Sequence, residues 1–101
     1  MEKLVASRYE TFKIPVDETT DFVTVLRPDG KTEKAFPFLR KPVRFEYDKE
    51  GFEQVIPEGT TLFCCRYTPD FTGEALLSVY NKKGDISANF SLSVLPSEKR
   101  G

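Results

Sequence analysis

The stretch that decides the fold runs from Thr61 to Val79 and reads TLFCCRYTPDFTGEALLSV. On each side of its polar corner, every second residue suits burial, which is the pattern of strands with one buried face. The inward sets are Phe63, Cys65 and Tyr67 before the corner, and Ala75, Leu77 and Val79 after it. We therefore predict that these two strands pair with each other at the centre of an antiparallel sheet.

Four residues define the corner: Arg66, Tyr67, Pro69 and Gly73. Pro69 has no backbone donor, so strand pairing must stop there. Gly73 can adopt backbone dihedrals that are closed to other residues, so the chain can turn there. We predict a structural role for all four.

The rest of the chain alternates in short segments separated by turn residues. The clearest turns are Pro28-Asp29-Gly30 and Asn81–Gly84. Further strands are predicted over residues 9–14, 22–27, 31–36 and 86–94, and no long segment has the period of a helix. Their inward residues are Phe12 and Ile14 in the first, Val23 and Val25 in the second, and Phe90, Leu92 and Val94 in the last. This pattern predicts an all-β fold, an immunoglobulin-like antiparallel β-sandwich of about seven strands. It forms one domain over residues 1–101, with frayed ends at 1–7 and 97–101.

Aromatic residues between positions 36 and 57 do not follow one period, and three prolines interrupt the segment. Apart from a possible strand at 43–47, we predict a long loop with a charged tip at 48–51. Its candidate functional residues are Phe36, Phe38, Tyr47 and Phe52. These rings could close the open end of the sandwich, dock against another domain, or contact a ligand such as a sugar.

Composition argues against several functional classes. The net charge is −1 with acidic and basic residues interspersed, so no basic surface for nucleic acid is expected. No apolar run is long enough to cross a bilayer, and Met1–Arg8 is too short and too charged for a signal peptide, so we expect a cytoplasmic protein. There is no histidine, and the carboxylates are scattered over turns. We expect no catalytic residues, no metal and no cofactor.

The two cysteines are adjacent. Strand alternation places Cys65 in the core and Cys64 on the outer face, which disfavours a disulfide between them. The interpretation as two structural thiols is favoured over a vicinal disulfide or a redox pair.

Four short pieces, in order, resemble a known family. They are Tyr9-Glu10 with Phe12, Arg27-Pro28-Asp29-Gly30, Ala35-Phe36-Pro37-Phe38, and Arg66-Tyr67-Thr68-Pro69 leading to Gly73-Glu74. Together they are similar to the N-terminal β-sandwich domain that precedes (β/α)8 catalytic domains in bacterial glycoside hydrolases. Residues 90–97 followed by Arg100-Gly101 resemble the segment that leads into the barrel. The chain departs from the family at Phe63, where tryptophan is usual, and at Ala75, where an aromatic residue is common.

This resemblance implies a non-catalytic accessory module that packs against a catalytic barrel of the same parent chain. It implies that the chain is a fragment of a longer protein, with Phe36 and Phe38 facing the barrel. The Tyr-Thr-Pro corner is also similar to filamin-type immunoglobulin repeats, which implies a protein-interaction module that accepts a partner strand at a sheet edge. A carbohydrate-binding module that acts alone is a third possibility.

Overall fold

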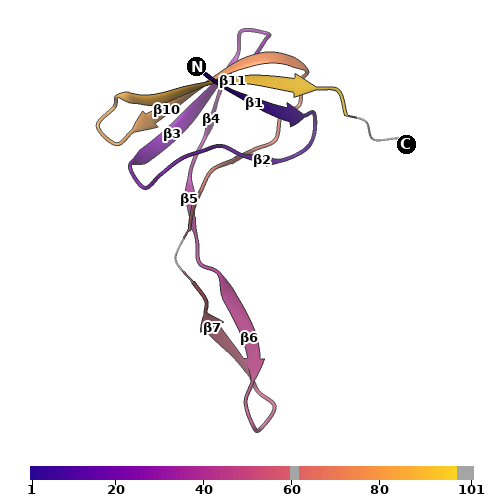
Figure 1. Ribbon diagram of the computed structural model, residues 1–101, viewed down its shortest axis with the longest axis vertical. Helices are drawn as coiled ribbons and strands as arrows, with labels where there is room; N and C mark the ends of the chain where they lie inside the picture. The colour runs from indigo at the N-terminus through magenta and orange to yellow at the C-terminus, as the bar shows by residue number, and fades with distance from the viewer. Residues whose placement is uncertain (60–61, 98–101) are drawn as a thin grey trace.

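The computed structural model describes residues 1–59 and 62–97, and all of its regular elements are strands (Figure 1). They are β1 (Glu2–Ser7), β2 (Phe12–Lys13), β3 (Thr20–Leu26), β4 (Thr32–Ala35), β5 (Phe38–Arg40), β6 (Val43–Tyr47), β7 (Glu53–Pro57), β8 (Leu62–Cys64), β9 (Arg66–Tyr67), β10 (Gly73–Asn81) and β11 (Ile86–Leu95). The described residues contain no helix, so the predicted all-β class is confirmed.

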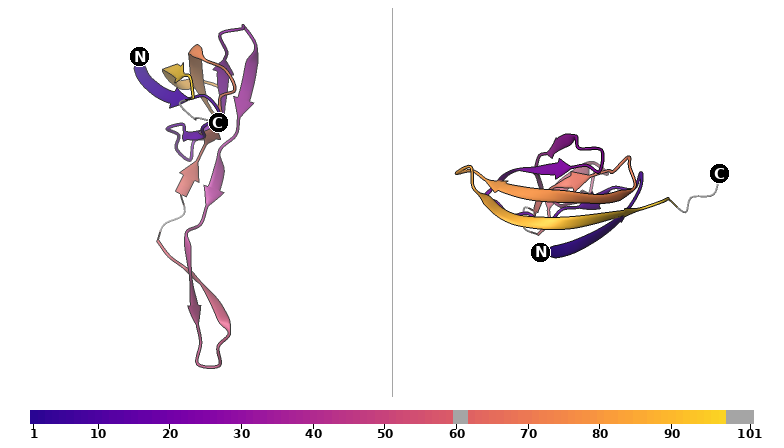
Figure 2. Two further views of the ribbon diagram at one scale, coloured as in Figure 1. Left: turned by 90° about the vertical axis from the view of Figure 1, so that its right-hand side faces the viewer. Right: turned by 90° about the horizontal axis from the view of Figure 1, so that it is seen from above.

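The main body is a five-stranded sheet in the order β1-β11-β10-β3-β4. β1 runs parallel to β11, and the other neighbours are antiparallel. β10 is the central strand, where Leu77 lies opposite Phe90 of β11 and Val25 of β3. The view from above shows the strong curvature of this sheet (Figure 2).

One face of the sheet carries the core. The inward sets predicted for β3, β10 and β11 are buried: Val23 and Val25, Ala75, Leu77 and Val79, and Phe90, Leu92 and Val94. Alternation with a period of two places these residues on one face of the sheet. A shift of one residue would move them all to the other face, so burial of this face fixes the pairing register.

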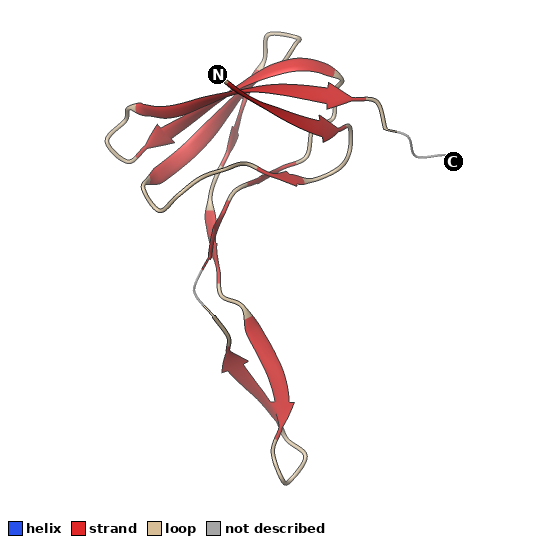
Figure 3. Cartoon of the chain, viewed as in Figure 1, coloured by secondary structure: helices blue, strands red, loops and turns tan. Residues whose placement is uncertain are grey.

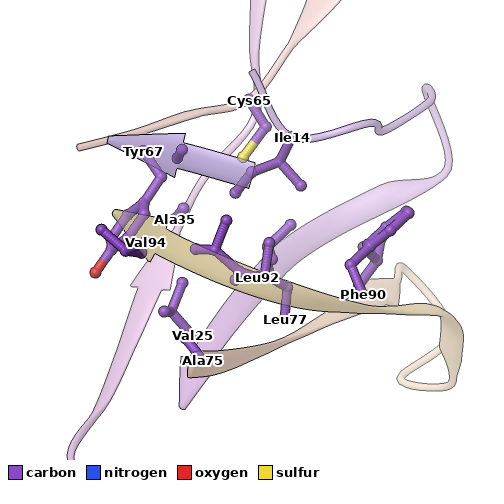
Figure 4. Packing of buried hydrophobic residues seen from close by; sticks show 13 residues of the cluster. Ile14, Val25, Ala35, Cys65, Tyr67, Ala75, Leu77, Phe90, Leu92 and Val94 are labelled. Atoms are coloured by element: carbon purple, nitrogen blue, oxygen red, sulfur yellow. The ribbon is translucent and has the colours of Figure 1, made fainter. Parts of the chain in front are cut away.

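A smaller second layer covers this core. It contains β2 paired with β9, and Ile14 follows β2, with its backbone N–H 2.8 Å from the carbonyl oxygen of Cys65. Ile14, Cys65 and Tyr67 are buried against the sheet residues (Figure 4). The predicted strand at 9–14 is therefore much shorter than expected, although Ile14 faces inward as predicted.

The predicted pairing of the two strands around the corner is wrong. β8 pairs with β5, and β9 pairs with β2, whereas β10 pairs with β3 and β11. The corner around the fully buried Pro69 carries the chain from one layer to the other, so the flanking strands belong to different layers. The predicted start at Thr61 lies outside the described residues.

The N-terminal residues are ordered, contrary to the predicted fraying. Leu4 and Ala6 lie opposite Leu92 and Val94, which gives β1 an inward face of its own. Residues Glu2–Ser7 pair with the backbone of β11. No local feature of the sequence predicts this pairing. Of the predicted C-terminal frayed segment, residues 98–101 lie outside the described residues.

A hairpin arm projects from this body and replaces the predicted long loop (Figures 1, 2 and 3). Its inner part is the β5–β8 ladder and its outer part is the β6–β7 ladder. The arm gives the chain a longest dimension of 58 Å and a radius of gyration of 17.6 Å, whereas a compact chain of this length has about 13 Å.

Candidate interaction surface

The outer arm is a two-stranded ribbon with one apolar face. In the β6–β7 ladder Val43 lies opposite Pro57, and Phe45 lies opposite Val55. Opposed residues of an antiparallel pair point to the same side, and alternate residues share that side. The apolar face therefore carries Val43, Phe45, Tyr47, Val55 and Pro57, with Glu53 opposite Tyr47 at its outer end. Every one of these residues is exposed.

The opposite face of the ribbon is mainly polar. It presents Arg44, Glu46 and Gln54, together with the half-buried Ile56. The Arg44 Nε and Glu46 Oε1 atoms form an ion pair at 3.1 Å. The ribbon is thus amphipathic although neither face is covered, and an isolated two-stranded hairpin is only marginally stable in water.

The tip of the arm is a tight turn organised by Asp48. Its Oδ1 accepts hydrogen bonds from the backbone N–H groups of Glu50 and Phe52, at 3.0 and 2.8 Å. Gly51 supplies the positive φ that the turn requires, +86°. The charged tip predicted at 48–51 is therefore correct, and the turn holds Phe52 exposed at the end of the arm.

The four candidate aromatic residues are all exposed, but they do not form one site. Phe36 lies at the root of the arm, where its ring centroid is 6.5 Å from that of Phe22 on the outer face of the main sheet. Phe38 lies in β5, with the Arg66 guanidinium 5.6 Å from its ring centroid. Tyr47 and Phe52 lie at the far end.

Sequence reasoning missed the other exposed apolar residues of the arm. Of the 15 large hydrophobic residues exposed among the described residues, nine lie between Phe36 and Leu62. Those not predicted are Leu39, Val43, Phe45, Val55 and Leu62. The alternation at 43–47 is the available signal, but alternation alone does not show whether another layer covers the apolar side.

The chain also exposes more surface than its size requires. Its accessible surface is 7304 Å², whereas a folded monomer of 11.5 kDa exposes about 5,800 Å². The excess of about 1,500 Å² is larger than the roughly 800 Å² that each partner buries in a standard protein–protein interface. Most of the exposed large apolar residues belong to the arm, so the arm is the candidate site.

The predicted structural corner is held by an ion-pair cluster. The Tyr67 hydroxyl donates a hydrogen bond to Glu33 Oε2 at 2.9 Å. Arg27 donates to Glu33 and, at 2.7 Å, to Asp70 Oδ1, which links the β3–β4 hairpin to the corner. Of the other predicted corner residues, Pro69 is fully buried, Gly73 has φ +112°, and Arg66 is exposed.

This cluster makes stability depend on pH. Burial, and then the hydrogen bond to Glu33, raise the pKa of Tyr67 above its ordinary value of about 10. Above that pH the unfolded chain loses the phenol proton while the folded chain keeps it, so stability falls as pH rises. We expect Tyr67→Phe to reduce this alkaline loss, as measured by urea unfolding between pH 8 and 11. Tyr47→Phe, on the exposed arm, is the control, and an equal reduction there would contradict the assignment.

Both cysteines are free thiols, and Cys65 belongs to the core cluster as predicted. Cys64 is also buried, although it lies outside that cluster. β8 ends at Cys64 and pairs with β5, whereas β9 begins at Arg66 and pairs with β2. Both cysteines line one small cleft together with residues 13–16 and 62–63. Burial raises the pKa of the Cys65 thiol.

A second concavity, of about 770 Å³, lies where β1 and β11 end. Its lining includes Tyr9, which has a left-handed φ of 67°, uncommon for a residue other than glycine. The Arg8 guanidinium lies 4.9 Å from the Tyr9 ring centroid. No sequence signal identified this position.

No family model, curated protein or solved structure matches the chain. Among the described residues, no cluster of three or more His, Cys, Asp or Glu side chains could hold a metal ion. The same residues include no helix long and apolar enough to cross a membrane.

Proposed function

We propose that this chain is a non-catalytic accessory β module that docks onto a partner domain through its arm. The observation that carries this proposal is the concentration of exposed large apolar side chains along the whole arm, nine of them between Phe36 and Leu62. Contiguous exposed apolar surface of this kind marks interaction sites in soluble proteins.

The partner domain that we propose is the (β/α)8 catalytic domain of a glycoside hydrolase. This choice rests on the four sequence pieces that resemble the N-terminal domains of such enzymes. On this proposal, the five-stranded sheet and the β2–β9 layer are the two layers of an immunoglobulin-like sandwich. Phe36 and Phe38 at the root of the arm face the catalytic domain, which brings the substrate chemistry.

The root suits this role because its aromatic residues are held in place while their rings remain accessible. Phe36 is 64% exposed beside Phe22, which is itself stacked on Tyr80 with ring centroids 4.9 Å apart. The pre-ordered rings lose little conformational entropy on binding, which favours aromatic anchors at interfaces.

Hydrogen exchange in the chain alone and in the longer parent chain tests the docking. We expect amides of β5 and β8 to exchange at least tenfold more slowly in the parent chain. The double variant Phe36→Ser with Phe38→Ser should lose most of that protection. Lys83→Ser, in the exposed turn between β10 and β11, is the matched control and should retain it. Unchanged exchange in the parent chain would overturn the docking.

The non-catalytic part is tested with chromogenic aryl glycosides. We expect the chain by itself to release no aryl alcohol above the uncatalysed rate, because the reacting carboxylates belong to the partner domain. Turnover that persists through successive purification steps would overturn this part of the proposal. A parent chain that contains further β modules and no barrel would overturn the choice of partner.

A further inference from the structure

We propose that the outer arm is covered by the outer arm of a second copy of this chain, with the two ribbons antiparallel and their apolar faces in contact. This inference goes beyond the proposed function, since it assigns an occupant to the outer arm, whereas the proposed docking uses the root. It assigns the β6–β7 ribbon to the second copy and leaves Phe36 and Phe38, at the root, to the partner domain.

The apolar face has the form that a twofold contact requires. Phe45 and Val55 form the middle rung of the β6–β7 ladder, with one apolar rung on its inner side, Val43 with Pro57. On its outer side Tyr47 lies opposite Glu53. A twofold axis through the middle rung places the inner rung of each copy over the outer rung of the other. A self-complementary patch of this kind is what a symmetric dimer uses.

The charges along the arm favour the antiparallel orientation. The inner end carries Arg40 and Lys41 together with Glu58, while the tip carries Asp48, Glu50 and Glu53 with Lys49, so the inner end is net basic and the tip net acidic. Arg44 and Glu46 offset each other, since they form an ion pair on the polar face. Antiparallel arms therefore bring a basic inner end over an acidic tip at both ends of the contact. Parallel arms would oppose like charges, which costs free energy.

The size of the contact sets its strength. Phe45 and Tyr47 can each bury roughly 150–250 Å², so two such faces remove on the order of 1,000 Å² from water. That area lies at the lower end for specific interfaces, and we expect a dissociation constant of roughly 10–100 µM. Charge pairs at its rim are screened by salt, so the dimer should weaken as ionic strength rises.

Sedimentation equilibrium of the chain between about 1 µM and 1 mM tests the proposal. We expect a monomer–dimer equilibrium at low salt, and a shift of at least tenfold towards monomer for the double variant Phe45→Ser with Val55→Ser. Gln54→Ser changes the adjacent rung, opposite Glu46 on the polar face, and should leave the equilibrium unchanged. A chain that stays monomeric at 1 mM, or a dimer indifferent to the double variant, would overturn the proposal.

A charge exchange tests the orientation without depending on apolar packing. We expect Arg40→Glu with Lys41→Glu to weaken self-association at least tenfold, and Glu50→Lys with Glu53→Lys to do the same. An equimolar mixture of the two variants should associate, because an acidic inner end of one then meets a basic tip of the other. Parallel arms would oppose like charges both before and after each exchange, so self-association that is unchanged in both variants would overturn the antiparallel orientation. A mixture that remains monomeric would overturn the contact between the charged ends.

The outcome separates this inference from the proposed function. Monomeric chains in which the β6–β7 amides become protected only in the parent chain would overturn the second copy and keep docking to the partner domain. A dimer in which β5 and β8 gain no protection in the parent chain would support the second copy and overturn that docking.

Discussion

Replacing Leu77 by alanine is expected to lower the free energy of unfolding by about 3 kcal/mol, within the 2–5 kcal/mol range of buried leucine truncations. Leu77 is fully buried in the central strand β10, between Phe90 of β11 and Val25 of β3. Neighbours on both sides belong to one hydrogen-bonded sheet, so they cannot easily close the cavity. Urea unfolding followed by far-ultraviolet circular dichroism measures this change.

The matched control is Leu76→Ala, at the next position of the same strand. Its side chain lies on the outer face of the sheet and is only half-buried. We expect a loss of less than about 1.5 kcal/mol there, because part of the side chain is already in water. Equal losses at both positions would contradict the assignment of the core to one face.

Replacing Gly73 by alanine is the second large expected effect, a loss of about 1–3 kcal/mol. Gly73 has φ +112°, a value that other residues rarely adopt, and it begins β10 at the corner. A Cβ atom at this position would lie 3.4 Å from the Cγ atom of Pro28, at the short limit of ordinary van der Waals contact. The backbone strain and this contact act together.

Gly84→Ala separates the two contributions. Gly84 also has a positive φ, +89°, but a Cβ atom there would meet no atom within 4 Å. We expect Gly84→Ala to destabilise the chain less than Gly73→Ala, and thermal unfolding of the two variants gives the comparison. A larger loss at Gly84 would show that the contact with Pro28 and the corner conformation add nothing.

The arm shows why part of the candidate site escaped prediction. Phe36, Phe38, Tyr47 and Phe52 could be selected because aromatic residues outside a regular period have no evident place in a core. Val55 and Leu62 could not be selected, because nothing local distinguishes an exposed apolar residue from a buried one. They are exposed because no other described strand packs as a second layer over the β5–β8 and β6–β7 ladders of the arm.

The sequence by itself determined the all-β class, the inward face of β3, β10 and β11, and the turns at Gly30 and Gly84. These features are local: alternation places side chains on one side of a strand, and glycine permits the positive φ of each turn. The tertiary structure decided which strands are neighbours, including the pairing of β1 with β11 and the change of partner at Cys64. It also decided that the β5–β8 and β6–β7 ladders leave the body as an arm. Backbone hydrogen bonds are the same for every residue type, so the sequence of a strand does not name its partner. Strand pairing depends instead on contacts between residues distant in the sequence.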